Sequence, residues 1–184
     1  MNYTNYFSQY KKSLNDLLND VDESLIEDTC NLIFKTNNIK KKIYIVGNGG
    51  SASIASHVSV DFAKVAGFKS STFNNSNLIT CFANDYGYEN WVTEAMKAYS
   101  LKDDLFILIS SSGESPNIVN AAKFCKNNER NLITFSGFNK ENSLSKYGKI
   151  NFHVNSNQYN FIEMVHHIIL VSIVDIFSSK LNQN

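Results

Sequence analysis

The chain lacks the features that mark membrane-spanning, secreted and nucleic-acid-binding proteins. Its 184 residues include 17 basic and 17 acidic ones, a balance that gives no electrostatic attraction to nucleic acid or to an anionic membrane surface. No uninterrupted apolar run approaches the roughly 20 residues of a membrane span. The closest, residues 161–177, is interrupted by Glu163, His166, His167 and Asp175. The N-terminal residues lack the basic start and apolar core of a signal peptide. We therefore expect no nucleic-acid partner and no membrane partner.

Cysteine and proline are scarce. Cys30, Cys81 and Cys125 are odd in number and lack metal-type spacing, so we interpret them as free thiols of a cytoplasmic protein. Pro116 is the only proline, and neither a repeat nor a low-complexity linker marks a domain boundary. We therefore expect residues 1–184 to form a single domain, which this length favours.

Short apolar runs alternate with helical patterns along most of the chain. Helical spacing predicts two helices within residues 3–36 and further helices over 51–65, 88–99, 116–127 and 160–179. Apolar runs predict strands at 43–46, 105–109, 132–135 and 151–154, with a weaker candidate at 71–73. Strands that alternate with helices indicate an α/β fold with a parallel sheet. In such folds, ligands bind at the carboxyl ends of the strands.

A glycine-rich turn, GNGGS at residues 47–51, follows the first predicted strand. Glycines let the backbone approach a ligand closely, and the free N–H groups of a helix start attract anions. The turn lacks the GxGxxG spacing of dinucleotide sites and the GxxxxGK[ST] spacing of a P-loop, so we expect no nucleotide cofactor. Alone, the turn is as typical of ordinary α/β packing as of ligand binding.

A serine-rich turn, SSSGES at residues 110–115, follows another predicted strand and precedes Pro116, which suits the first turn of a helix. One serine is enough to cap a helix. Four hydroxyls beside exposed N–H groups instead match the oxygens of a phosphate, which we expect to be bound by Ser110, Ser111, Ser112 and Ser115. Two strand-to-helix anion sites in one small chain predict a phosphorylated small-molecule ligand.

Ionisable side chains occur at helical spacing on two predicted helices. His57 and Asp61 are four residues apart and share a face, either as a plain hydrogen-bonded pair or as part of a site. Glu163, His166 and His167 lie on a helix that is apolar on almost every side, where ionisable groups are paired or functional. The residues alone leave a satisfied core cluster and an active site open.

Asn84 and Asp85 form another polar pair, close to a glycine at position 87. One interpretation is an Asx-type turn that caps the helix predicted from Tyr88. The other is polar contact with a polyol ligand. The residues alone do not separate the two.

In their order along the chain, these segments resemble the SIS (sugar isomerase) domain and, within it, the phosphoheptose isomerases. The resemblance rests on GNGGS at 47–51 with His57, AND at 83–85 with Tyr88 and Glu89, SSSGESPN at 110–117, TFSG at 134–137 and EMVH at 163–166. It implies a three-layer, flavodoxin-like α/β sandwich with a five-stranded parallel sheet in residues 37–184. It also implies an N-terminal helical arm, residues 1–36, used in oligomerisation, and a homotetramer with its sites at subunit interfaces.

The resemblance further implies an intramolecular oxidoreductase, an aldose–ketose isomerase for heptose synthesis in lipopolysaccharide or capsule formation. Sedoheptulose 7-phosphate would become D-glycero-D-manno-heptose 7-phosphate through an enediol. Carried over by position, the sugar contacts fall on Asn48, Gly49, Ser51, Asn84, Asp85, Asn160 and Glu163.

The chain departs from the family at two catalytic positions, where Asp61 replaces a glutamate and Val171 replaces a histidine. We expect Asp61 to be the base and His167, one turn before Val171, to take the role of the histidine. Some family members carry zinc, and an alternative use of this region is a zinc site, one per active site, made by His57, Asp61, Glu163 and His167.

Three other functions remain open for this sequence. They are a non-catalytic SIS module of the kind that binds a replication initiator, a sugar-phosphate sensor, and an isomerase of a different sugar phosphate. The departures at positions 61 and 171 favour the non-catalytic module. The retained serines at 110–115 and the ionisable cluster at 163–167 favour an enzyme.

Overall fold

A computed structural model describes residues 2–181. In chain order the elements are α1 (Tyr3–Asn19), α2 (Ser24–Asn38), β1 (Ile43–Gly47), α3 (Gly49–Lys64), β2 (Ser70–Ser71), α4 (Ser76–Tyr86), α5 (Trp91–Tyr99), β3 (Leu105–Ile109), α6 (Pro116–Asn127), β4 (Asn131–Ser136), the 3₁₀ turn η1 (Leu144–Lys146), β5 (Ile150–His153) and α7 (Tyr159–Leu181).

The five strands form one parallel sheet in the order β2-β1-β3-β4-β5. The chain runs outward from β1 to β2 on one side and from β3 to β5 on the other, so the direction of winding reverses between β1 and β3. Gly47 and Ile109, the last residues of these two central strands, are paired in register. The sheet therefore has its ligand-binding crevice where β1 and β3 end side by side.

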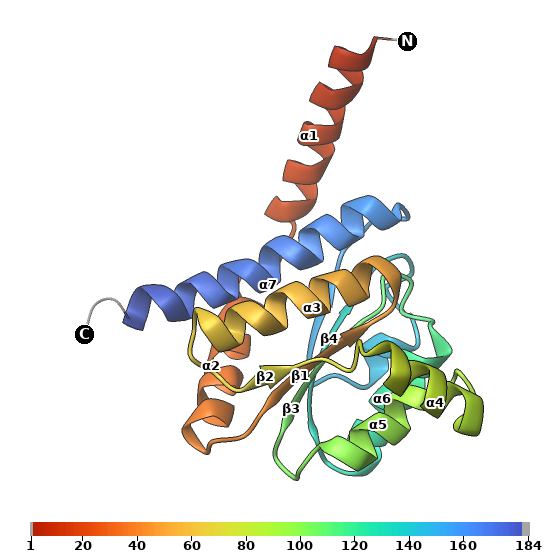
Figure 1. Ribbon diagram of the computed structural model, residues 1–184. Helices are drawn as coiled ribbons and strands as arrows, with labels where there is room; N and C mark the ends of the chain where they lie inside the picture. Colours follow the sequence, from red (N-terminus) through yellow and green to blue (C-terminus); the bar gives the residue numbers. More distant parts are fainter. Residues whose placement is uncertain (1, 182–184) are drawn as a thin grey trace.

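Helices cover both faces of this sheet (Figure 1). Ile43 and Ile45 of β1 pack with α2, α3 and α7, whereas Tyr44 and Val46 pack with α5 and α6, and with the apolar side chains of α4 at the margin. This alternation follows from the two-residue period of a strand, which sends successive side chains to opposite faces. The predicted three-layer α/β fold with a five-stranded parallel sheet is confirmed.

Helix α1 leaves the body of the domain, and its first half projects away from α7 (Figure 1). Where the two helices meet, the Tyr10 ring stacks on Phe161 with centroids 4.4 Å apart. Beyond that contact Tyr3, Tyr6 and Phe7 are exposed. The use of residues 1–36 in oligomerisation, and the division of the chain at residue 37, stay predictions.

Helix α7 is the most apolar helix of the protein, and by length and composition alone residues 159–179 could cross a membrane. Half of its most apolar window is buried inside the protein, as expected for the core helix of a soluble domain. His166 is fully buried on this helix, and its Nε2 lies 3.1 Å from the carbonyl oxygen of Ser136 at the end of β4. Burial lowers the pKa of His166 to about 4, so the ring is neutral at pH 7.

Helix α4 was not predicted from the sequence, and the helix predicted from residue 88 begins later, since α5 starts at Trp91. Asn84 and Asp85 therefore lie in the last turn of α4 and form no turn that caps a helix from Tyr88. The missed signal was Asn75, whose side-chain oxygen accepts hydrogen bonds from the N–H groups of Asn77 and Leu78.

Candidate functional site

A pocket of about 230 Å³ opens at the carboxyl ends of β1 and β3. It contains eight residues that the sequence analysis assigned to the ligand, namely Asn48, Gly49, Ser51, Ser110, Ser111, Ser112, Ser115 and Glu163. Gly50, Ile109 and Tyr159 complete the lining. The two turns and the start of α7, far apart in the sequence, thus meet in one pocket, which we call the serine pocket.

The serine pocket lies at the starts of α3 and α6, whose N-cap residues are Asn48 and Ser115. Neither side chain makes a capping hydrogen bond, so the capping role considered for the serine turn is wrong in this structure. The first N–H groups of a helix carry partial positive charge and bind anions. Two uncapped helix starts lie beside four serine hydroxyls, an arrangement that suits an anion, and the lining contains no lysine or arginine. The binding of a phosphate by these serines stays a prediction.

The serine turn is held in shape by bonds that leave several donors available. Ser110 Oγ donates to Ser115 Oγ at 3.1 Å, and Ser112 Oγ accepts from the Glu114 N–H at 3.2 Å. Within residues 2–181, the N–H groups of Ser111, Ser112 and Ser115 have no hydrogen-bond acceptor. These N–H groups remain available for the oxygens of a bound anion.

The Asn48 side chain lines the serine pocket, but its amide is already paired. It exchanges two hydrogen bonds of 2.9 Å with the amide of Asn117, and its oxygen accepts a third, of 3.3 Å, from the Tyr88 hydroxyl. Asn48 therefore ties β1 to α6 and fixes the spacing of the two turns. A direct contact of Asn48 with a sugar stays a prediction.

Glu163 is the one ionisable carboxylate in the lining of the serine pocket. Its carboxylate lies against Gly50, so close that a Cβ at position 50 would overlap with it. Glycine at position 50 is therefore what lets α7 bring a carboxylate to the start of α3. Within the described residues, the half-buried Glu163 side chain has no hydrogen-bond or ion-pair partner.

The two predicted catalytic residues, Asp61 and His167, lie outside the lining of the serine pocket. His57 Nδ1 is 2.8 Å from His167 Nε2, and His57 Nε2 is 3.1 Å from Asp61 Oδ2. These three side chains, which we call the α3–α7 cluster, form a chain in which His57 is the middle member. The His57 side chain is 53% exposed. Burial first, and the neighbouring His57 second, lower the pKa of His167, while Asp61 acts in the opposite direction.

The predicted zinc ligands do not come together in this structure. The two histidine nitrogens bond each other across 2.8 Å rather than converge on a common point, and Glu163 lies apart against Gly50. Among residues 2–181, no group of three or more His, Cys, Asp or Glu side chains is arranged to hold a metal ion. As placed, the four residues do not fit zinc, and the zinc site stays a prediction.

Three predicted sugar contacts also lie outside the serine pocket lining, namely Asn84, Asp85 and Asn160. Asn84 Nδ2 donates to Asp85 Oδ1 at 2.9 Å on the exposed side of α4. Tyr159, beside Asn160, enters the pocket instead and was missed by the sequence analysis. The feature that could have identified Tyr159 is its position as the first residue of α7, one turn before Glu163.

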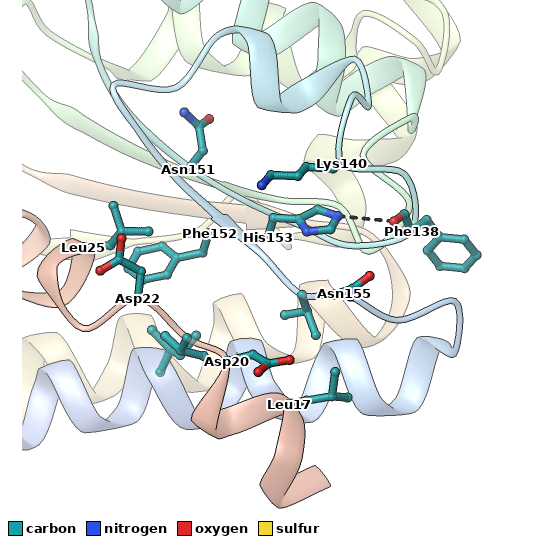
Figure 2. A pocket seen from close by; sticks show the side chains of 13 residues that line it. Leu17, Asp20, Asp22, Leu25, Phe138, Lys140, Asn151, Phe152, His153 and Asn155 are labelled. Carbon is teal, nitrogen blue, oxygen red and sulfur yellow. Dashed lines mark hydrogen bonds between the residues drawn. The ribbon is translucent and has the colours of Figure 1, made fainter. Parts of the chain in front are cut away.

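A larger cavity, of about 500 Å³, lies between the α1–α2 turn and β5 (Figure 2). Its charged rim consists of Asp20, Asp22 and Lys140, all exposed, while His153 contacts the Phe138 carbonyl with 3.2 Å between Nε2 and oxygen. None of the residues that the sequence analysis assigned to a ligand line this cavity. Its polar groups are those of an ordinary solvated surface, so the serine pocket is the stronger candidate site.

Comparison with known proteins decides the family. The sequence model of the SIS domain matches residues 5–137. The chain belongs to the SIS domain family. Phosphoheptose isomerase 2 of Campylobacter jejuni is 35% identical over 122 residues, which cover 62% of this chain and 60% of that protein. Phosphoheptose isomerase of Helicobacter pylori strain 26695 is 32% identical over 137 residues, or 71% of each chain.

The SIS fold is also clear from solved structures. That of phosphoheptose isomerase GmhA from Neisseria gonorrhoeae superposes with a TM-score of 0.86 at 20% identity, covering 97% of this chain and 100% of the other. The recognition of an SIS domain similar to phosphoheptose isomerases is thus confirmed.

Proposed function

We propose that this SIS domain is a cytoplasmic sugar-phosphate isomerase that interconverts a ketose and an aldose, with sedoheptulose 7-phosphate as its substrate. The observation that carries the proposal is the serine pocket, where two uncapped helix starts and four serines match a phosphate. The relatives named phosphoheptose isomerase support the choice of a seven-carbon sugar. The product would be a heptose 7-phosphate for surface-polysaccharide synthesis.

The chemistry requires a proton to move between C1 and C2 of the open-chain sugar through an enediol. With the phosphate at the serine turn, the rest of the sugar would extend along residues 49–51 toward Glu163 and Tyr159, which line the same pocket. Asp61 and His167 stand outside this pocket in their own chain. They would reach a sugar only if a second copy brought its pocket to the outer side of α3 and α7.

A homotetramer with shared sites is part of this proposal. Exposed apolar side chains surround the α3–α7 cluster, including Val60, Met164 and Ile168, and more occur on the projecting half of α1. Large apolar side chains that are exposed to solvent often mark protein–protein contacts. Sedimentation equilibrium of the full chain would test the assembly.

Proton exchange detected by NMR would test the activity. The protein is incubated with sedoheptulose 7-phosphate in deuterated water, with and without zinc, and the C1 and C2 signals are followed. We expect deuterium to enter the sugar as an aldose forms. Clear binding by calorimetry without exchange, for this sugar and for a panel of other ketose and aldose phosphates, would contradict an isomerase and favour a sensor.

A further inference from the structure

Glu163 combines three properties that no other ionisable residue near the serine pocket shares. It lines the pocket itself, it is half-buried, and it has no hydrogen-bond or ion-pair partner among residues 2–181. Asp61, by contrast, is engaged with His57 at 3.1 Å and lies outside the lining. A carboxylate whose lone pairs are not used by the protein is available to a ligand in the same pocket.

A plain structural role for Glu163 does not account for its position. A glutamate at a helix start commonly accepts hydrogen bonds from the first N–H groups. Here the carboxylate overlies Gly50 in the first turn of α3, yet it accepts no such bond from a described residue. The close approach therefore does not cap α3, and the glycine at position 50 leaves space for the carboxylate inside the pocket.

We propose that Glu163 is the base that moves the proton between C1 and C2 of the sugar phosphate. This inference rests on the proposed function and assigns its chemistry to one residue of the pocket's own chain. A general base must be within hydrogen-bond reach of the proton that it removes. Of the carboxylates in the described residues, only Glu163 lines the pocket that also holds the four serines.

The proton and electrons balance with this single residue. The Glu163 carboxylate takes a proton from C1, the C–H electron pair forms the C1=C2 double bond, and the carbonyl pair moves onto O2. The hydroxyl proton then passes from O1 to O2 within the enediolate. An O1 lone pair then re-forms the carbonyl at C1, and the C1=C2 pair takes the proton back from the Glu163 carboxyl to form the C2–H bond, which gives the aldose.

The test compares Glu163→Gln with three other variants. Glutamine keeps the size of the side chain but is no base, whereas Glu163→Asp keeps the carboxylate. Asp61→Asn removes the rival base. Asp175→Asn removes one charge from an exposed carboxylate on the same helix and is the matched control. Deuterium entry at C1 of sedoheptulose 7-phosphate is measured by NMR, and the zinc content and melting temperature of each protein are recorded.

We expect Glu163→Gln to slow exchange at least about 100-fold, the usual loss for a missing general base, with KM changed only a few-fold. Glu163→Asp should keep more activity than Glu163→Gln, and Asp175→Asn should match the wild type.

Exchange by Glu163→Gln within about threefold of the wild-type rate would overturn the role of Glu163. Joint loss of bound zinc and activity in that variant would also overturn it, because the carboxylate would then serve a metal. A wild-type protein that exchanges no sugar phosphate at all would instead refute the proposed function, and with it this role.

Discussion

The serine pocket and the α3–α7 cluster both include residues of α3 and α7 but differ in almost every physical respect. The pocket is concave, lies at the switch point of the sheet, and presents uncapped helix starts and a carboxylate that has no partner within residues 2–181. The cluster lies on the outer side of α3 and α7, and its two histidine rings bond each other. The pocket thus has donors and acceptors that are available to a ligand, whereas the side chains of the cluster bond mainly to one another.

This difference separates what a single chain can do from what needs a second one. The serine pocket brings the proposed phosphate-binding residues together within one chain, because both turns and the start of α7 meet at the ends of β1 and β3. The cluster is half-exposed among apolar side chains and faces no cavity that the serines line. Binding is therefore expected of the isolated chain, and any role of the cluster depends on assembly.

The largest effect is expected from the pocket. Changing Ser110 and Ser111 together to alanine removes two hydroxyls from the lining of the serine pocket, where we propose that the phosphate binds. A hydrogen bond to a charged group contributes about 2 kcal/mol, so the double variant should bind sedoheptulose 7-phosphate about 1,000-fold more weakly. Isothermal calorimetry measures the change.

The control for that variant is Ser8→Ala, an exposed serine on α1. It should leave the affinity as it is in the wild type. Unaltered binding by the double variant would show that the ligand does not use the serine turn, and the contrast between pocket and cluster would lose its basis.

The second-largest effect is expected on stability and concerns His166, on α7. This helix carries Glu163 on the pocket side and His167 on the outer side. The pKa of His166 is about 4 in the folded protein, chiefly because of burial, with a nearby His153 acting in the same direction. In the unfolded chain it returns to about 6.5. Between these two pKa values only the unfolded state binds the proton, so acidification favours unfolding. Burial of the neutral His166 ring therefore costs no stability above pH 6.5, and the free energy of unfolding decreases as the pH falls from 6.5 toward 4.

The size of this loss is about 3 kcal/mol in the free energy of unfolding. Urea unfolding at pH 7 and pH 4.5 measures it for the wild type and for His166→Gln, whose amide can still donate to the Ser136 carbonyl. The glutamine variant should lose less stability on acidification. An equally steep loss in both proteins would assign acid sensitivity to other groups.

The sequence predicted those features of the fold and of the serine pocket that depend on local sequence pattern. The apolar runs before residues 47 and 110 and the glycine and serine turns after them located β1, β3 and the pocket, because parallel strands end at one edge. Helix α4 was missed, since its apolar residues at 78, 79 and 82 are few and follow a run of asparagines and serines. Its capping residue, Asn75, carried the only clear signal.

Placement of the ionisable residues could not be obtained in this way. Helical spacing puts Glu163 and His167 on a shared face, four residues apart, yet the structure directs one to Gly50 and the other to His57. Which neighbour each side chain meets depends on how α7 packs on α3, and residues 57 and 167 are 110 positions apart. Periodicity within one helix contains no information about that contact.

The smallest effect is expected within the α3–α7 cluster, and it tests whether its three side chains interact as placed. In His57→Asn the neighbouring positive charge is lost, so the pKa of His167 should rise. In Asp61→Asn the favourable negative charge is lost, so the same pKa should fall. Long-range proton–nitrogen NMR of the His167 ring during a pH titration measures both shifts. Stability should change by less than about 1 kcal/mol, because both members of the His57–Asp61 pair are partly exposed to solvent. Shifts in the same direction in both variants would show that His57 does not stand between Asp61 and His167, and the cluster would then have no internal bonding to set it apart from the serine pocket.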